Sequence, residues 1–228
     1  MSFGQNLKNL RCAKLPPLTQ TDLANAIGVT QRKISFLETG ASEPSHADNP
    51  LELLIATRLS AQCTDARVNL VTPALFAKYP TLEDYCNAQV EDVEQLIHSC
   101  GFYHGKARDI IAMAQKIRDD FGGKVPDTME GLTSLQGVGR KTANLILGDI
   151  YKKPAVVTDT HLIRLANRLG LVATKDPYKL EMALKKLFPP EESNDFCHRA
   201  VLHGRAVCTA RKANCEACCM QSFCKKKI

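Results

Sequence analysis

Apolar residues recur every three or four positions in segment after segment of this 228-residue chain. Such spacing is typical of helices that bury one face. It is clearest in four runs, Leu51 to Leu59, Val90 to Ile97, Ile110 to Phe121 and Leu162 to Leu169. Only Ala155 to Thr158 has the composition of a short extended segment. The sequence therefore predicts an all-α fold.

The overall composition narrows the class of protein further. With 44% hydrophobic residues, the chain can bury a substantial core in one large or two modest domains. A net charge of +6 suits a polyanionic partner such as nucleic acid, although many ordinary proteins share it. No stretch approaches the roughly 18 apolar residues of a spanning helix, and the polar start lacks a signal-peptide core. We expect a cytoplasmic protein with no membrane partner.

Ten cysteines in a chain without a secretory signal favour reduced thiols or metal ligation over disulfides. Five of them crowd into the last 21 residues: Cys208, Cys215, Cys218, Cys219 and Cys224. Four thiolates on one short segment suit either a zinc ion or an iron–sulfur cluster. Zinc modules usually contain two Cys-x2-Cys pairs, and this segment has a single pair at Cys215 and Cys218 in the ligand pattern. Cys219 falls outside that pattern and is predicted to be a free thiol.

Two glycines separated by one residue interrupt the helical pattern of Leu135 to Asn144. Glycine permits positive φ angles and close backbone approach, so a hairpin here can present peptide N–H groups to a DNA phosphate. The segment is predicted to form a helix-hairpin-helix whose DNA contacts come from Gly137, Val138, Gly139 and Arg140. Taken alone, the glycine pair fits a tight interhelical turn without a ligand equally well.

Two further motifs accompany the hairpin, Leu59-Ser60-Ala61-Gln62 before it and Val157-Thr158-Asp159-Thr160-His161 after it. Together they make residues 46–224 resemble the endonuclease III family of DNA repair glycosylases. The resemblance implies a helical barrel domain over residues 46–153, a cluster domain over residues 154–228, and a DNA cleft between them. It also implies a 4Fe-4S cluster, because the family's ligand spacing matches Cys208, Cys215, Cys218 and Cys224.

The same resemblance assigns catalytic roles to two residues. The family's nucleophile is the lysine just after the hairpin, which is Lys141 in this chain. It would attack C1′ of the damaged nucleotide, expel the base and form a Schiff base that undergoes β-elimination 3′ to the lesion. An amine can form this iminium, whereas a bound water can only hydrolyse. Asp159 would stabilise the positive charge on the sugar and assist proton transfer.

A base in duplex DNA must leave the stack before a protein can act on it. By resemblance, Gln62 fills the resulting gap and Phe102 wedges the partner strand. An aliphatic wedge is more usual in the family, and the competing interpretation is that Phe102 belongs to the core. The implied partner is double-stranded DNA with oxidised pyrimidines or abasic sites. We expect a monomer located at the nucleoid, since a self-contained cleft needs no second chain.

Residues 1–45 are predicted to form a separate unit, because their sequence has the pattern of a helix-turn-helix. The segment resembles a truncated Cro/repressor-type DNA-binding domain in Leu18-Thr19-Gln20, Gly28-Val29 and Ile34-Ser35. In that family residues 31–33 would begin the recognition helix that faces the major groove. The two further helices that normally complete the domain are missing. A DNA-binding role and a remnant that packs on the larger domain therefore both stay open.

Two alternative functions follow from these features. A monofunctional adenine-type mismatch glycosylase would share the hairpin, the aspartate and the cluster, but it would not need a lysine at position 141. A DNA-binding regulator would use residues 1–45, with the remainder acting as a redox-sensing module. The intact pair Lys141 and Asp159 favours the bifunctional glycosylase and lyase.

Overall fold

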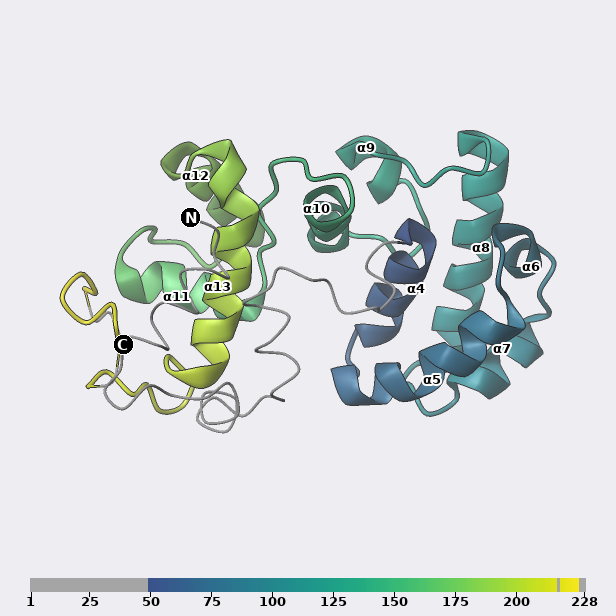
Figure 1. Ribbon diagram of the computed structural model, residues 1–228, viewed down its shortest axis with the longest axis horizontal. Coiled ribbons are helices and arrows are strands. Elements are labelled where there is room, and N and C mark those ends of the chain that lie inside the picture. Colours follow the sequence, from purple (N-terminus) through teal and green to yellow (C-terminus); the bar gives the residue numbers. More distant parts are fainter. Residues whose placement is uncertain (1–48, 217, 226–228) are drawn as a thin grey trace, which may run out of the picture.

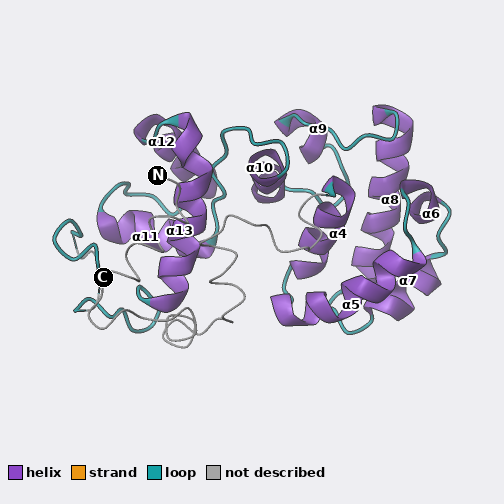
Figure 2. Ribbon diagram, viewed as in Figure 1, coloured by secondary structure: helices purple, strands orange, loops and turns teal. Residues whose placement is uncertain are grey.

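The computed structural model describes residues 49–216 and 218–225, so the predicted helix-turn-helix segment lies outside the described residues. Helices account for all regular structure in the described part, and its only β-type pairing is an isolated bridge between Cys208 and Ala213 (Figure 2). The predicted all-α fold is confirmed. None of the described helices is long and apolar enough to span a membrane.

Two lobes lie side by side in the molecule (Figure 1). The first, here called the hairpin lobe, comprises residues 49–155 and has one hydrophobic core. Helix α8 runs through it and contacts α4, α6 and α7. Its buried face includes Ile110, Met113 and Ile117. The helices of this lobe are α4 (Pro50–Ser60), α5 (Asp65–Lys78), α6 (Leu82–Cys86), α7 (Val90–Ile97), α8 (Tyr103–Phe121), α9 (Met129–Thr133) and α10 (Arg140–Asp149).

The second lobe, here called the cysteine lobe, begins at Val156 and has a separate core. Leu162 and Leu165 pack there with Leu180 and Leu184. The two cores divide after Ala155, within the segment expected to be extended, which is a loop. The exact domain boundaries at 153/154 stay a prediction. The helices of this lobe are α11 (Thr160–Leu169), α12 (Pro177–Leu187), the 3-10 helix η1 (Pro190–Glu192) and α13 (Ser193–Ala206).

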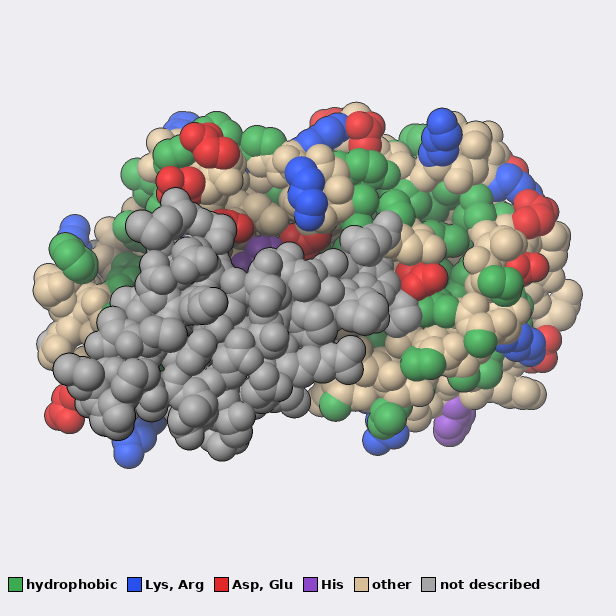
Figure 3. Space-filling model, in the orientation of Figure 1, with side chains coloured by type: hydrophobic (Ala, Val, Ile, Leu, Met, Phe, Trp, Pro, Cys, Tyr) green, Lys and Arg blue, Asp and Glu red, His purple; other side chains and the backbone are tan. Residues whose placement is uncertain are grey.

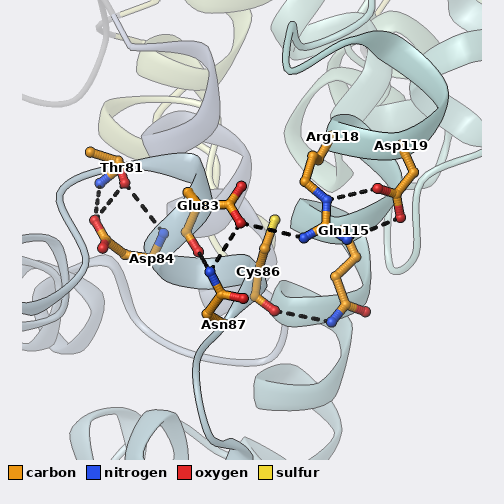
Figure 4. A network of polar contacts seen from close by, with 8 residues as sticks. All are labelled: Thr81, Glu83, Asp84, Cys86, Asn87, Gln115, Arg118 and Asp119. Atoms are coloured by element: carbon orange, nitrogen blue, oxygen red, sulfur yellow. Dashed lines mark hydrogen bonds and ion pairs between the residues drawn. The ribbon is translucent and has the colours of Figure 1, made fainter.

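Short helices of the hairpin lobe are held by polar contacts at their ends. Helix α6 begins with a capping box, in which Thr81 and Asp84 satisfy each other's backbone N–H groups (Figure 4). At its other end, Gln115 of α8 donates to the Cys86 carbonyl oxygen at 3.1 Å (Figure 4). A five-residue helix has little stability of its own, so the capping box stabilises α6 and the Gln115 contact fixes it on α8.

Polar contacts also join the two lobes. His198 Nε2 of α13 lies 2.8 Å from Asp149 Oδ1, at the end of α10. The contact raises the pKa of His198, so the imidazolium form strengthens the bridge. A second bridge runs from Arg140 Nε and Nη2 to the two carboxylate oxygens of Glu181, both at 2.8 Å. Charges of both signs are otherwise spread over both lobes on the face shown in Figure 3.

Glu181 is a buried carboxylate, with 1% of its side chain exposed. Burial raises its pKa, but hydrogen bonds from Arg140 and Lys185 outweigh burial and bring the net pKa below the ordinary 4.5. This group therefore stabilises the fold above pH 4.5 and loses that contribution as pH falls through its lowered pKa.

We expect Glu181→Gln to lower the free energy of unfolding by about 2 kcal/mol at pH 7. The value lies below that for fully buried ion pairs because Arg140 and Lys185 are partly exposed. Urea titrations at pH 7 and pH 4 check this, with the exposed Glu191→Gln as the control. The gap between wild type and variant should shrink at pH 4; an equal gap at both would contradict the assignment.

Candidate active site

The predicted hairpin lies between α9 and α10, and its glycines have different structural roles. Gly137 has a φ of +75°, a region that residues with a side chain rarely adopt. A Cβ at this position would lie 2.6 Å from Arg58 Nε and 3.1 Å from Asp109 Oδ2. Those two side chains form an ion pair beneath the hairpin, with Nε and Oδ2 2.7 Å apart. Both the backbone angle and this packing require glycine at position 137.

Gly139 is the N-cap of α10, and its φ of −93° is open to any residue. A Cβ here would have no neighbour within 4 Å. The cap supplies no side-chain acceptor, so N–H groups of the first turn remain available to an external anion. The hairpin thus offers open space and backbone donors together, which is the combination that phosphate binding needs.

Arg140 follows directly but its guanidinium turns to Glu181 of the cysteine lobe. The ring of Tyr178 also lies under it, 4.8 Å from the guanidinium carbon. With 39% of its side chain exposed, Arg140 mainly fixes the start of α10 against the second lobe. Its predicted contact with DNA stays a prediction.

Lys141 is exposed in the first turn of α10, and Asp159 lies at the start of α11. Both line one cavity of about 590 Å³, so the fold brings together two residues that the sequence separates by 18 positions. Within the described part of the chain, the Lys141 ammonium has no hydrogen bond or ion pair. Helix α10 of the hairpin lobe and α13 of the cysteine lobe both contribute to the lining. The other lining residues are Thr57, Ser60, Thr142, Leu145, Val157, Asp195, Cys197, His198, Arg199, Val201, Leu202 and Arg205.

Asp159 is held by its own helix. It is the N-cap of α11, and its Oδ1 accepts a hydrogen bond from the Leu162 N–H at 2.7 Å. Aspartate is among the preferred residues at this position because its carboxylate satisfies a free N–H group. The cap fixes the carboxylate while its second oxygen keeps its acceptor capacity.

Gln62 and Phe102 share an unusual backbone conformation. Their φ angles are +53° and +60°, and only one other non-glycine residue in the described part, Lys152, has a positive φ. Their loops touch, since a Cβ on Gly101 would lie 3.7 Å from the Gln62 carbonyl oxygen. Phe102 is 72% exposed, so the interpretation of Phe102 as a core residue is wrong. Left-handed backbone at non-glycine residues stores strain and tends to occur at functional sites.

The four cysteines of the predicted cluster line one small cavity of about 30 Å³. Arg168 Nη1 of α11 donates to Cys208 Sγ at 3.2 Å. Cys219 is exposed and does not line this cavity. Among the described residues, no three metal-ligating side chains converge on the position of a single ion. The thiols share one cavity and have a cationic neighbour. Four thiol donors beside a cation fit a metal centre that is bound through sulfur.

Sequence reasoning missed two buried charged residues, Glu181 and Lys106. Each had a recognisable signal, because each occupies an apolar face at helical spacing. Glu181 adjoins Leu180 and precedes Leu184 by three residues, and Lys106 precedes Ile110 by four. A charge on the buried side of a helix requires a partner, and only the folded chain shows which partner it has.

Comparison with known proteins matches this architecture and its motifs. Residues 55–190 match the family model of the HhH-GPD superfamily base excision DNA repair proteins. Endonuclease III of Synechocystis is 46% identical over 189 residues, which cover 82% of this chain and 86% of the relative. Endonuclease III of Escherichia coli K12 is 38% identical over 179 residues, covering 78% and 85%.

Solved structures agree with the sequence relatives. A trapped endonuclease III–DNA covalent intermediate with an estranged adenine superposes with a TM-score of 0.76 at 38% identity, covering 92% of this chain and 97% of that one. A thermostable thymine-DNA glycosylase has the same fold, with a TM-score of 0.73, 23% identity and coverage of 91% and 96%. The chain therefore belongs to the endonuclease III family within the HhH-GPD superfamily of base excision DNA repair proteins.

Proposed function

We propose that this protein is a bifunctional DNA glycosylase and AP lyase that removes oxidised pyrimidines. The observation that carries the proposal is the shared cavity of Lys141 and Asp159 next to the hairpin. An amine and a carboxylate facing one cavity can cleave a glycosidic bond and retain the sugar as an iminium. Relatives named endonuclease III and a trapped endonuclease III–DNA intermediate support the same chemistry.

The proposed reaction proceeds in two stages. The neutral Lys141 amine forms a bond to C1′ as the bond between C1′ and the base nitrogen breaks and the base leaves with a proton. The C1′–O4′ bond of the amino sugar then breaks, O4′ takes up a proton, and an iminium forms between Nζ and C1′. Loss of a proton from C2′ breaks the C3′–O bond and releases the 3′ phosphate, and hydrolysis of the iminium regenerates the amine. Asp159 stabilises the cationic sugar and carries protons between these steps.

Duplex DNA is the proposed partner, and two surface features support its binding. The hairpin presents backbone N–H groups beside the open space at Gly139. Gln62 and Phe102 project from adjoining loops with strained backbones, as residues that replace an extruded base need to do. We propose that a monomer binds DNA in the cytoplasm, at the nucleoid, and that Gly137, Val138 and Arg140 complete the hairpin's contact.

The two hairpin glycines offer a matched pair of variants. Gly137→Ala should destabilise the fold by about 2 kcal/mol, because the residue has a positive φ and crowds Arg58. Gly139→Ala should cost less than about 1 kcal/mol, yet weaken binding of a duplex with a stable abasic analogue about tenfold. Urea unfolding and fluorescence anisotropy measure the two effects. Unchanged affinity in Gly139→Ala would show that no phosphate approaches this backbone.

We propose that Cys208, Cys215, Cys218 and Cys224 hold a 4Fe-4S cluster. Their common cavity and the guanidinium of Arg168 support a group with several sulfur atoms and net negative charge. Such a cluster would cross-link the four cysteines and so help to hold the C-terminal loop on α11, where Arg168 already contacts Cys208.

Cys215→Ser and Cys219→Ser test this ligand set. Cys215→Ser should lose most of the bound iron and inorganic sulfide, whereas Cys219→Ser should match wild type because Cys219 lies outside the cavity. Iron, sulfide and zinc analysis of anaerobically purified protein provides the measurement. One zinc per chain with no sulfide would instead support the zinc alternative.

Borohydride trapping of the wild-type protein tests the proposed function. Duplexes with one thymine glycol, one abasic site or one adenine–guanine mismatch are incubated separately with the protein, with and without borohydride. We expect reduced covalent adducts with the first two and none with the mismatch. Release of adenine without any adduct would identify the monofunctional alternative, and inertness toward all three duplexes would overturn the glycosylase assignment.

A further inference from the structure

Lys106, in the first turn of α8, is a charged residue that the proposed reaction does not use. Only 1% of it is exposed, and it lies on the face of α8 that carries Ile110 and Met113. Burial lowers the pKa of its ammonium. No carboxylate pairs with Nζ among the described residues, and the nearby titratable groups are the thiols of Cys63 and Cys100 and the guanidinium of Arg58. A cation buried without a counter-ion is costly, so a lysine here needs an explanation beyond packing.

The Lys106 side chain links the end of α4, just before Gln62, to the start of α8, just after Phe102. Its Nζ donates to the Leu59 carbonyl oxygen at 2.8 Å, and its backbone N–H donates to the Phe102 carbonyl oxygen at 3.1 Å. Leu59 is in the last turn of α4, where carbonyl groups lack helical partners and the helix dipole favours a cation. Gln62 follows three residues later, at the first of the two strained positions.

The thiols beside Lys106 belong to the same two loops. Cys63 follows Gln62 and Cys100 precedes Phe102 by two residues. Burial and the neighbouring Cys63 thiol raise the pKa of the Cys100 thiol. Lys106 therefore lies at the common base of both loops. Its side chain binds the end of α4 just before the Gln62 loop, and its backbone belongs to the first turn of α8 just after Phe102. Two neighbouring left-handed residues persist only when surrounding contacts hold them, and the Lys106 side chain joins the two helix ends from which these loops emerge.

We propose that Lys106 is a positioning residue for base extrusion, which holds the Gln62 and Phe102 loops together so that both side chains enter the DNA at once. The inference rests on the proposed function, because only an enzyme that extrudes a base needs this arrangement. Lys106 does not touch the reacting atoms. Its loss should slow steps that open the duplex and spare the chemistry at an abasic site that is already unpaired.

Lys106→Met tests the proposal, since methionine has a similar length but no donor. The matched control is Lys116→Met on the exposed side of the same helix. One readout is the fluorescence of 2-aminopurine placed opposite a stable abasic analogue, which rises when the base loses its stacking partners. A second is the rate of thymine glycol removal from duplex, and a third is borohydride trapping on a single-stranded abasic oligonucleotide.

We expect Lys106→Met to lose most of the fluorescence rise and to remove thymine glycol at least about fivefold more slowly. Its trapping rate on single-stranded DNA should stay within about twofold of wild type, and the control should match wild type throughout. Lys106→Gln, whose shorter side chain does not reach Leu59, is measured in the same way and replaces the methionine variant should that variant not fold.

The outcomes separate this inference from the proposed function. Wild-type fluorescence and duplex cleavage in both Lys106 variants would overturn the positioning role alone. Equal slowing on duplex and single-stranded DNA would also overturn it, because general instability affects both substrates. A wild-type protein that traps no DNA and leaves 2-aminopurine stacked would overturn the proposed function together with this inference.

Discussion

Lys141→Ala is expected to abolish the borohydride-trapped adduct and to slow removal of thymine glycol by at least about a thousandfold. The loss should be this large because the variant has no amine that could attack C1′ and remain bound to the sugar. Folding should be unaffected, since Lys141 is exposed in the first turn of α10. Its ammonium also has no partner among the described residues whose loss would destabilise the protein.

The control for this substitution is Lys186→Ala. Lys186 is an exposed lysine on α12, outside the cavity of Lys141 and Asp159. This substitution removes one positive charge without changing the cavity. Any loss of activity that comes only from weaker attraction to DNA should therefore appear in both variants. A residual adduct in Lys141→Ala would mean that another amine is the nucleophile, and peptide mapping of the trapped complex would locate it.

The residues that the sequence identified most directly belong to short local motifs. Gly137 and Lys141 lie within five residues of each other, and the cluster cysteines lie within 17. Their spacing alone limits their geometry, because a tight turn or a short loop brings such neighbours together in any fold. The clearest helices, such as α8 and α11, were also predictable because one apolar face continues for several turns.

Contacts between distant segments were not predictable in this way. Arg140 was expected at DNA, but its guanidinium binds Glu181, which is 41 residues away. Nothing in the local sequence of either residue specifies the other, since their meeting depends on how α12 packs beside the hairpin. Helix α5 is not among the four clearest apolar runs of the sequence, and its interior contains Pro73, a residue that usually interrupts a helix.

The backbone conformations of Gln62 and Phe102 were likewise not predictable from the sequence. Resemblance placed Gln62 and Phe102 at the DNA, but their backbone strain and their common support by Lys106 come only from the folded chain. Nothing in the sequence indicates a positive φ at a glutamine or a phenylalanine, because glycine is the residue that favours this conformation. Strain at a non-glycine residue is thus information that the structure adds to the motif.

Two substitutions of Asp159 are expected to separate its contribution to stability from its contribution to catalysis. Asp159→Asn keeps an oxygen that can accept the Leu162 N–H, so the cap of α11 and the free energy of unfolding should stay near wild type. Asp159→Ala removes this acceptor and should cost about 1 kcal/mol. Both remove the negative charge from the cavity of Lys141, so both should slow base removal by about a hundredfold or more.

Urea unfolding and single-turnover release of thymine glycol measure the two effects on the same preparations. Asp176→Asn is the matched control, because Asp176 caps α12 in the same way but does not line the cavity. If Asp159→Asn were as active as wild type, the carboxylate would serve only as a cap and the cationic sugar would need another stabilising group. If it were slow and as stable as wild type, charge alone would account for the loss, because the hydrogen bond at the start of α11 would be intact.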